Sequence, residues 1–185
     1  DGSHIKGLVL NMFHSLWPEL LQLNYVNCMV TPIIKANQGK KIKSFYTLTD
    51  YNKWKGKGNN NKWSIKYYKG LGTSTSNEAK DYFRDLKVNQ YITNEETDQS
   101  MILAFKKTEA DQRKSWLKTY KEEEILDYNC KDTKITDFIN REFKHFSNSD
   151  NLRSIGSCVD GLKVSQRKIL FSCFKRKLYS EIRVA

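Results

Sequence analysis

Residues Trp63–Leu86 have the sequence WSIKYYKGLGTSTSNEAKDYFRDL, which changes character twice along its length. Apolar and polar side chains alternate over its first six residues, and this period of two predicts a half-buried strand. The two glycines of Lys69–Gly72 then predict a tight turn, with a positive φ expected at Gly72. Thr75 followed three residues later by Glu78 fits a capping box, so a helix is expected next. Its apolar stripe comprises Ala79, Tyr82, Phe83 and Leu86.

A strand, a glycine turn carrying Lys69 and a helix N-terminus together favour an anion site. Free backbone N–H groups and the helix dipole both attract a phosphate at such a place. The alternative is an ordinary turn with a solvated lysine, and the KGLG pattern alone favours it because short glycine motifs recur widely.

The composition is that of a folded, basic chain. The 185 residues are 38% hydrophobic and 12% aromatic, enough to build the core of one or two small domains. Lys and Arg total 32 against 21 Asp and Glu, and this net charge of +11 predicts an acidic partner, above all nucleic acid, although a merely soluble basic protein is the alternative. No apolar run reaches membrane-spanning length, and no secretory signal opens the chain. The four cysteines form no CxxC pair, which suits a reducing compartment and argues against a zinc site or a disulfide scaffold.

The residues before Trp63 predict a helix and then a hairpin. A helical apolar stripe follows the loop Asp1–Ser3, and Pro18 is expected to kink this helix or to begin a new turn. The stripe comprises Ile5, Leu8, Val9, Met12, Phe13, Leu16 and Trp17. Tyr25–Ala36 and Lys43–Leu48 are expected to be two strands joined by a turn at Asn37–Gly39.

The residues after Leu86 predict one more strand and several helices. Val88–Ile92 is expected to be a strand, helices are expected from Met101 and over Thr108–Lys121, and Asp127–Lys134 is expected to be a connector with Asp132 and Thr133 as candidate caps. A further helical face comprises Ile135, Phe138, Ile139, Phe143 and Phe146.

The last forty residues predict a boundary and a basic helix. Ser147–Asn151 is a cluster of turn residues and the preferred domain boundary. Ser165 is expected to cap a final helix whose other positions are crowded with lysine and arginine. The residues expected to face inward are Ile169, Leu170, Cys173 and Phe174.

Three segments resemble eukaryotic type II DNA topoisomerases, in the order in which that family has them. Tyr67–Phe83, YYKGLGTSTSNEAKDYF, is similar to the central segment of the family. Asp1–Leu21 resembles the end of the acidic motif of the Toprim domain and the helix after it. Phe138–Lys175 resembles the segment that enters the breakage-reunion region. Together they span nearly the whole chain, and three long motifs in order are far more specific than one.

The resemblance implies an α/β fold class. The chain is expected to contain the C-terminal part of a Toprim (Rossmann-like) domain, a helical connector and the first helices of a winged-helix domain. The expected boundaries are residues 1–95, 96–134 and 135–185.

The resemblance also implies a metal and DNA site at the first residues. Asp1 matches the last aspartate of the Toprim run that holds Mg²⁺ together with an upstream glutamate. Because one carboxylate binds Mg²⁺ weakly, Asp1 is expected to hold the metal only in the intact protein, with ligands that precede it. His4 and Lys6 match the same motif and flank a helix N-terminus, where both can meet a DNA phosphate. For His4, a purely structural role is equally open.

A basic cluster near the end of the chain matches the segment that lines the DNA gate of the family. The DNA-binding residues implied there and at the glycine turn are Lys69, Gly70, Arg153, Lys163, Arg167 and Lys168. Several basic residues on one side of a helix suit the backbone of duplex DNA, although a solvated basic helix is the alternative. The chain departs from the family at Gly156 and Val164, where proline is usual, and at Ser165, where glycine is usual. These departures are expected to loosen the loop.

The implied function is ATP-dependent passage of one DNA duplex through a transient, tyrosine-linked break in another, by a nuclear homodimer. The chemistry is phosphoryl transfer to tyrosine, with Mg²⁺ stabilising the charge that develops. The nucleophilic tyrosine and its neighbouring arginine are expected after Ala185, and the ATP-binding region has no match in the chain. The chain is therefore expected to be an interior piece that holds no catalytic residue and is inactive alone.

Three rival interpretations remain. In bacterial gyrase and topoisomerase IV the KGLG and DGLK segments lie on separate subunits, whereas Gly70 and Asp160 share this chain. A non-catalytic DNA-binding module that keeps the fold is distinguished by its flanks, since the enzyme needs acidic residues before Asp1 and an arginine–tyrosine pair after Ala185. An RNA-binding protein is disfavoured because the aromatic residues lie at core spacings and no ribonucleoprotein motif is present.

Overall fold

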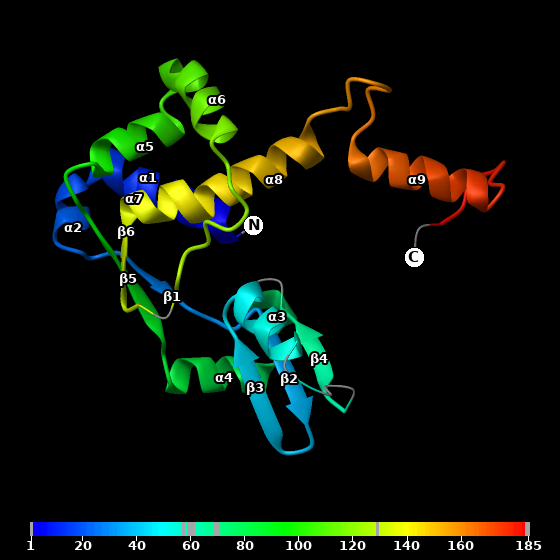
Figure 1. Cartoon of the computed structure of the whole chain (residues 1–185), viewed down its shortest axis with the longest axis horizontal. Coiled ribbons are helices and arrows are strands. Elements are labelled where there is room, and N and C mark those ends of the chain that lie inside the picture. Colours follow the sequence, from blue (N-terminus) through cyan, green and yellow to red (C-terminus); the bar gives the residue numbers. More distant parts are fainter. Residues whose placement is uncertain (1, 57, 59–61, 69–70, 129, 184–185) are drawn as a thin grey trace.

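The computed structural model describes residues 2–56, 58, 62–68, 71–128 and 130–183 (Figure 1). The α-helices are α1 (Gly2–Leu16), α2 (Pro18–Gln22), α3 (Leu48–Gly56), α4 (Ser76–Arg84), α5 (Thr97–Phe105), α6 (Ala110–Lys118), α7 (Ile135–Asp137), α8 (Lys144–Ser154) and α9 (Val164–Lys175). The 3₁₀ helices are η1 (Leu71–Thr73) and η2 (Lys107–Glu109), and η3 (Phe138–Phe143) is a π-helix. The strands are β1 (Asn27–Met29), β2 (Ile34–Gln38), β3 (Lys41–Phe45), β4 (Ser64–Tyr67), β5 (Val88–Ile92) and β6 (Asp132–Lys134).

Two small sheets organise these elements into a mixed α/β fold, as the sequence predicts. One sheet has the order β1-β5-β6, with an antiparallel β1–β5 pair and a parallel β5–β6 pair. The other has the order β3-β2-β4 and is antiparallel throughout. In Figure 1 the second sheet, with α3 and α4, forms a lobe below the first sheet and its helices.

Each sheet has its own hydrophobic core. The larger core joins α1, α2, α5, α7 and η3 to the first sheet, and its buried residues are Leu10, Leu21, Tyr91, Met101, Ile135, Phe138, Ile139 and Phe143. The smaller core lies between the second sheet and α3, and its buried residues are Ile34, Ala36, Phe45 and Tyr51. The apolar face predicted from Ile135 onward therefore belongs to the same core as the first helix of the chain.

The helix predicted over the first residues is present, but most residues of its predicted apolar stripe are exposed. α1 contacts the core through Gly7, Leu10 and Phe13, whereas Ile5 and Leu16 are exposed. Several apolar residues recur at helical spacing around this helix, so periodicity cannot decide which of them the rest of the chain covers. Pro18 begins α2, which confirms the prediction of a new turn there.

The strand predicted over Tyr25–Ala36 is two strands in different sheets. β1 pairs with β5 and β2 pairs with β3 and β4, and Pro32 lies between them. Proline lacks the N–H that a continuing ladder needs, so the chain leaves one sheet here and enters the other. The hairpin itself is confirmed, and Gly39 takes a φ of 58° at its turn.

Two predictions for the second half of the chain are wrong. Asp132 and Thr133 do not cap a helix but belong to β6, where Thr133 is buried. Ser147–Asn151 is no turn but lies inside α8, where the Ser147 hydroxyl donates to the carbonyl oxygen of Phe143 at 2.9 Å. Packing of the neighbouring apolar residues in the core overrides the turn-like composition of this cluster.

The final helix is present as α9, but it does not pack as predicted. Ile169, Leu170 and Phe174 are exposed, and Figure 1 shows α9 at the end of an arm that leaves the larger body after α8. Its N-cap is Lys163, whose backbone N–H donates to Oε1 of Gln166 at 2.8 Å, so Ser165 is not the cap.

Candidate nucleic-acid interface

The segment around the KGLG motif confirms its predicted strand and helix. β4 covers the alternating residues, and α4 begins at a capping box in which Thr75 and Glu78 each accept from the other's backbone N–H. The positive φ expected at Gly72 is wrong, because Gly72 lies in η1 outside the left-handed region and an added Cβ would meet open space. Lys69 and Gly70 lie outside the described residues, and their DNA-binding role stays a prediction.

The carboxylate of Glu78, at the start of α4, interacts with one hydroxyl group and two lysine side chains. Its carboxylate accepts from the Tyr68 hydroxyl, and its Oε2 lies 2.9 Å from Nζ of Lys66. Its Oε1 lies 3.6 Å from Nζ of Lys35, which also stands 4.6 Å above the ring of Tyr82. Burial raises the pKa of Glu78, but the hydrogen bonds from Tyr68 and Thr75 and the two lysines outweigh burial and bring the pKa to about 2.

The lowered pKa of Glu78 predicts a pH dependence of stability. Because the folded-state pKa lies below the unfolded value of 4.5, the stabilisation is complete above pH 4.5 and is lost as the pH falls toward about 2. We expect Glu78→Gln to lower the free energy of unfolding by about 1–2 kcal/mol at neutral pH and by much less at about pH 3. Urea unfolding at both pH values measures this, with the exposed Glu95→Gln as control. An equal loss at both pH values would contradict the prediction.

His4 on α1 and Arg153 on α8 each contact a side chain of α8. The His4 ring stacks on Phe146 with centroids 4.7 Å apart, and Arg153 Nε donates to Oδ1 of Asp150 at 2.9 Å. The hydrogen bond from Arg153 lowers the pKa of Asp150, and the charge of His4 acts in the same direction. Two predicted DNA-binding residues about 150 positions apart thus both lower the pKa of one carboxyl group.

Lys6 points to a different set of partners. Its Nζ lies 3.0 Å from Oε1 of Glu142 and donates to the hydroxyl of Tyr128 at 3.1 Å. The ammonium group therefore already has a carboxylate partner, and the DNA-binding role of Lys6 stays a prediction.

The loop before α9 is closed by its own hydrogen bonds. The N–H of Ser157 donates to the carbonyl oxygen of Leu162 at 3.0 Å, and Gly161 takes a φ of 70°. A Cβ on Gly156 would lie 2.5 Å from the carbonyl oxygen of Gly161, so the glycine permits this close approach. The loop geometry thus uses Gly156, and the loosening expected from the departures at Gly156, Val164 and Ser165 stays a prediction.

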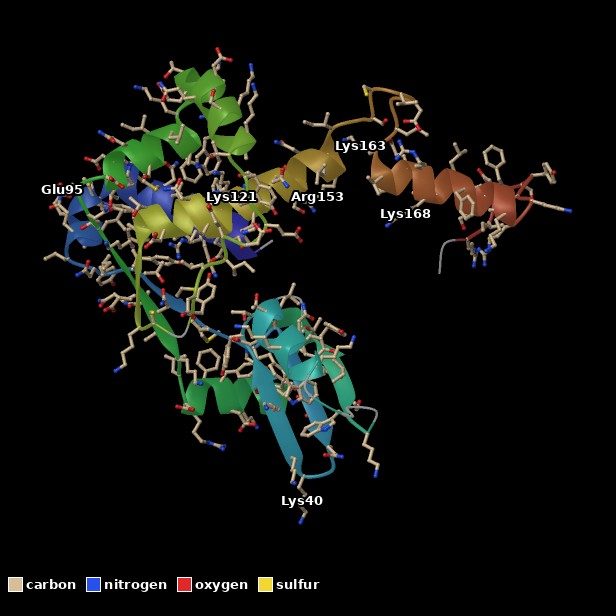
Figure 2. The ribbon with its side chains drawn as sticks, in the orientation of Figure 1. Lys40, Glu95, Lys121, Arg153, Lys163 and Lys168 are labelled. Atoms are coloured by element: carbon tan, nitrogen blue, oxygen red, sulfur yellow. The ribbon has the colours of Figure 1, made fainter. Side chains whose placement is uncertain are left out.

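The remaining predicted residues lie along the arm that ends in α9. Arg167 forms a two-pronged ion pair with Asp160, at 2.7 and 3.0 Å, and this hydrogen bonding lowers the pKa of the Asp160 carboxyl. Lys163 and Lys168 are exposed. Figure 2 shows Arg153, Lys163 and Lys168 following one another from the end of α8 onto α9, whereas Lys40 lies at the tip of the β2–β3 hairpin.

The described residues contain no group of three His, Cys, Asp or Glu side chains that could hold a metal ion. Asp1 lies outside the described residues, so its predicted role as a Mg²⁺ ligand stays a prediction. Within the same part of the chain, no helix is both long and apolar enough to cross a membrane.

The sequence analysis did not predict the carboxylates that form ion pairs with Lys6 and Arg153. Asp150 precedes Arg153 by one helical turn, a spacing that would have predicted the pair had this segment been recognised as a helix. Glu142 is 136 positions from Lys6, and no local pattern in the sequence could have paired them.

Comparison with known proteins gives one consistent family. The family model described as the C-terminal associated domain of TOPRIM matches residues 29–151. DNA topoisomerase 2-alpha of Homo sapiens is 46% identical over 201 residues, covering 100% of this chain and 13% of the human protein. DNA topoisomerase 2 top-2 of Caenorhabditis elegans is 46% identical over 202 residues, with the same two coverages of 100% and 13%.

A solved structure agrees with these relatives. The DNA-binding, cleavage and re-ligation domain of Plasmodium falciparum topoisomerase II superposes with a TM-score of 0.85 at 43% identity, covering 100% of this chain and 26% of that chain. The chain therefore belongs to the eukaryotic type II DNA topoisomerase family. It spans 13% of the length of the human and nematode relatives.

Proposed function

We propose that this chain forms part of the DNA gate of a type II topoisomerase that passes one duplex through a transient, tyrosine-linked break in another. The observation that carries the proposal is the basic arm, residues 151–185, which holds eight Lys and Arg but only two Asp and Glu. More than half of the net charge of +11 thus lies in the last fifth of the chain. Such a concentration of cations suits a polyanion.

The arm suits the DNA backbone better than the bases. Arg153, Lys163 and Lys168 are exposed and arranged along the length of the arm, and the charges of Arg153 and Arg167 are partly offset by their ion pairs with Asp150 and Asp160 (Figure 2). Lysine and arginine spaced along a surface meet successive phosphates, and phosphate contacts carry no sequence information directly. We therefore expect binding to duplex DNA with little sequence preference.

Salt titrations test this proposal. With roughly five phosphates engaged, the logarithm of the binding constant should fall with the logarithm of salt concentration with a slope of about −4 to −5. Lys163→Ala and Lys168→Ala should each reduce the slope by about one, and the control Lys40→Ala, at the hairpin tip, should leave it nearly unchanged. A response to salt that is flat, or equal losses for all three variants, would remove the DNA-gate assignment.

The cofactors of the proposed reaction, Mg²⁺ and ATP, would bind to the intact enzyme. Asp1 would supply one oxygen ligand to Mg²⁺, which stabilises charge on the attacked and leaving oxygens. ATP would be hydrolysed by a region that this chain does not match, in a nuclear homodimer. The proposal assigns no catalytic residue to this chain. The proposed role of the chain is to bind the DNA and to supply one ligand to the metal.

A further inference from the structure

Glu142 is the centre of a half-buried network that the proposed function does not explain. Its Oε1 accepts from the Ser3 hydroxyl at 2.8 Å and from Nζ of Lys6 at 3.0 Å. Its Oε2 is buried and has no hydrogen-bond partner among the described residues. The side chains of Lys6 and Glu142 are only 28% and 13% exposed. A carboxylate this covered depends on the few donors that it has.

Two features of the fold place Glu142 at the beginning of α1. It belongs to η3, and a π-helical turn inserts an extra residue that re-aims the side chains around it. At the same level, α1 approaches η3 through Gly7, where an added Cβ would lie 2.5 Å from the ring of Phe143. Without a side chain at Gly7, the two helices come close enough for Lys6 to reach Glu142.

Among the described residues, the network uses two of the donors of Lys6. A lysine ammonium has three N–H donors. One points to Glu142 and one to the hydroxyl of Tyr128, whose ring also lies 5.0 Å from Nζ. These contacts hold the side chain in one orientation and, within the part of the chain that the structure describes, leave the third N–H for an acceptor that approaches from solvent. Fixing a long side chain beforehand removes the conformational entropy that it would otherwise lose on binding.

We propose that Glu142 and Tyr128 are positioning residues that hold Lys6 for contact with a DNA phosphate. The inference rests on the proposed function and adds to it the residues that prepare this contact. In the alternative arrangement, Glu142 would compete with the DNA phosphate for Lys6 and so weaken DNA binding. The two arrangements predict opposite signs when the carboxylate is neutralised.

The experiment compares duplex DNA affinity for variants of the whole chain at one salt concentration. Glu142→Gln and the control Glu95→Gln each remove one negative charge, and Glu95 is exposed (Figure 2). We expect Glu95→Gln to bind as tightly as the parent or slightly tighter, and Glu142→Gln to bind at least about threefold more weakly. Tyr128→Phe changes no charge and should also weaken binding. Thermal melts establish that each variant is folded.

A second background separates positioning from general stability. In Lys6→Met, Glu142→Gln should change DNA affinity no more than Glu95→Gln does, because the lysine that it positions is absent. Tighter binding by Glu142→Gln than by Glu95→Gln would overturn the inference in favour of masking. A loss that persists in Lys6→Met would overturn it in favour of a structural role.

The Lys6 contact and DNA binding by the arm can be tested separately. If Lys6→Met binds like the parent, Lys6 makes no phosphate contact and the inference fails. The salt response of Lys163→Ala and Lys168→Ala would still decide the DNA-gate assignment, because those residues lie on the arm, whereas the partners of Glu142 are Ser3 and Lys6 on α1.

Discussion

Phe138→Ala is expected to lower the free energy of unfolding by about 3–5 kcal/mol, the range for a fully buried phenylalanine. Phe138 is 0% exposed and lies in the larger core, with its ring centroid 5.5 Å from that of Tyr91 in an edge-on arrangement. Truncation removes the apolar contacts and leaves a cavity between α7, η3 and β5 that the surrounding rings cannot close without moving.

Urea unfolding monitored by circular dichroism measures this effect, and thermal melts should show a fall in Tm of roughly 10 °C. The matched control is Phe171→Ala, because Phe171 is 65% exposed on α9 and its truncation should cost little. Equal losses for the two variants would mean that the larger core does not carry the stability of the chain.

Gly7→Val is expected to lower the free energy of unfolding by about 3 kcal/mol through overpacking. An added Cβ would lie 2.5 and 2.7 Å from two carbons of the Phe143 ring and 3.3 Å from the ring of Phe105. Phe143 cannot turn away cheaply, since it is buried against Phe105, Phe138 and Phe146. α1 must therefore move away from η3.

The control for this substitution lies in the same helix. Gly2→Val places the same side chain on α1, but nothing lies within 4 Å of its Cβ. It should unfold close to the parent, with denaturant midpoints as the measurement. Since the displacement in Gly7→Val would also separate Lys6 from Glu142, weaker DNA binding should accompany its lower stability. A stable Gly7→Val would contradict the close approach of α1 and η3.

Local interactions account for what the sequence by itself determined. The capping box at Thr75 and Glu78, the start of α2 at Pro18 and the β2–β3 hairpin with Gly39 were all predictable. Each depends on hydrogen bonds or backbone restrictions between residues a few positions apart, so the residue types and their spacing suffice. The long motifs likewise identified the family before any contact was known.

Only the tertiary structure decided which side of a helix is covered and which charges meet. The apolar stripe of α1 predicted its helix but not its buried face, since that face depends on where α5 and η3 lie. Asp132–Lys134 is a strand because β5 offers it a parallel partner 42 residues away, as the pairing of Gln90 with Asp132 shows. Likewise, the contact between Lys6 and Glu142 joins residues 136 positions apart through a close approach at Gly7. Such contacts form only when the whole chain packs, because their free energy comes from burial and proximity that no local pattern encodes.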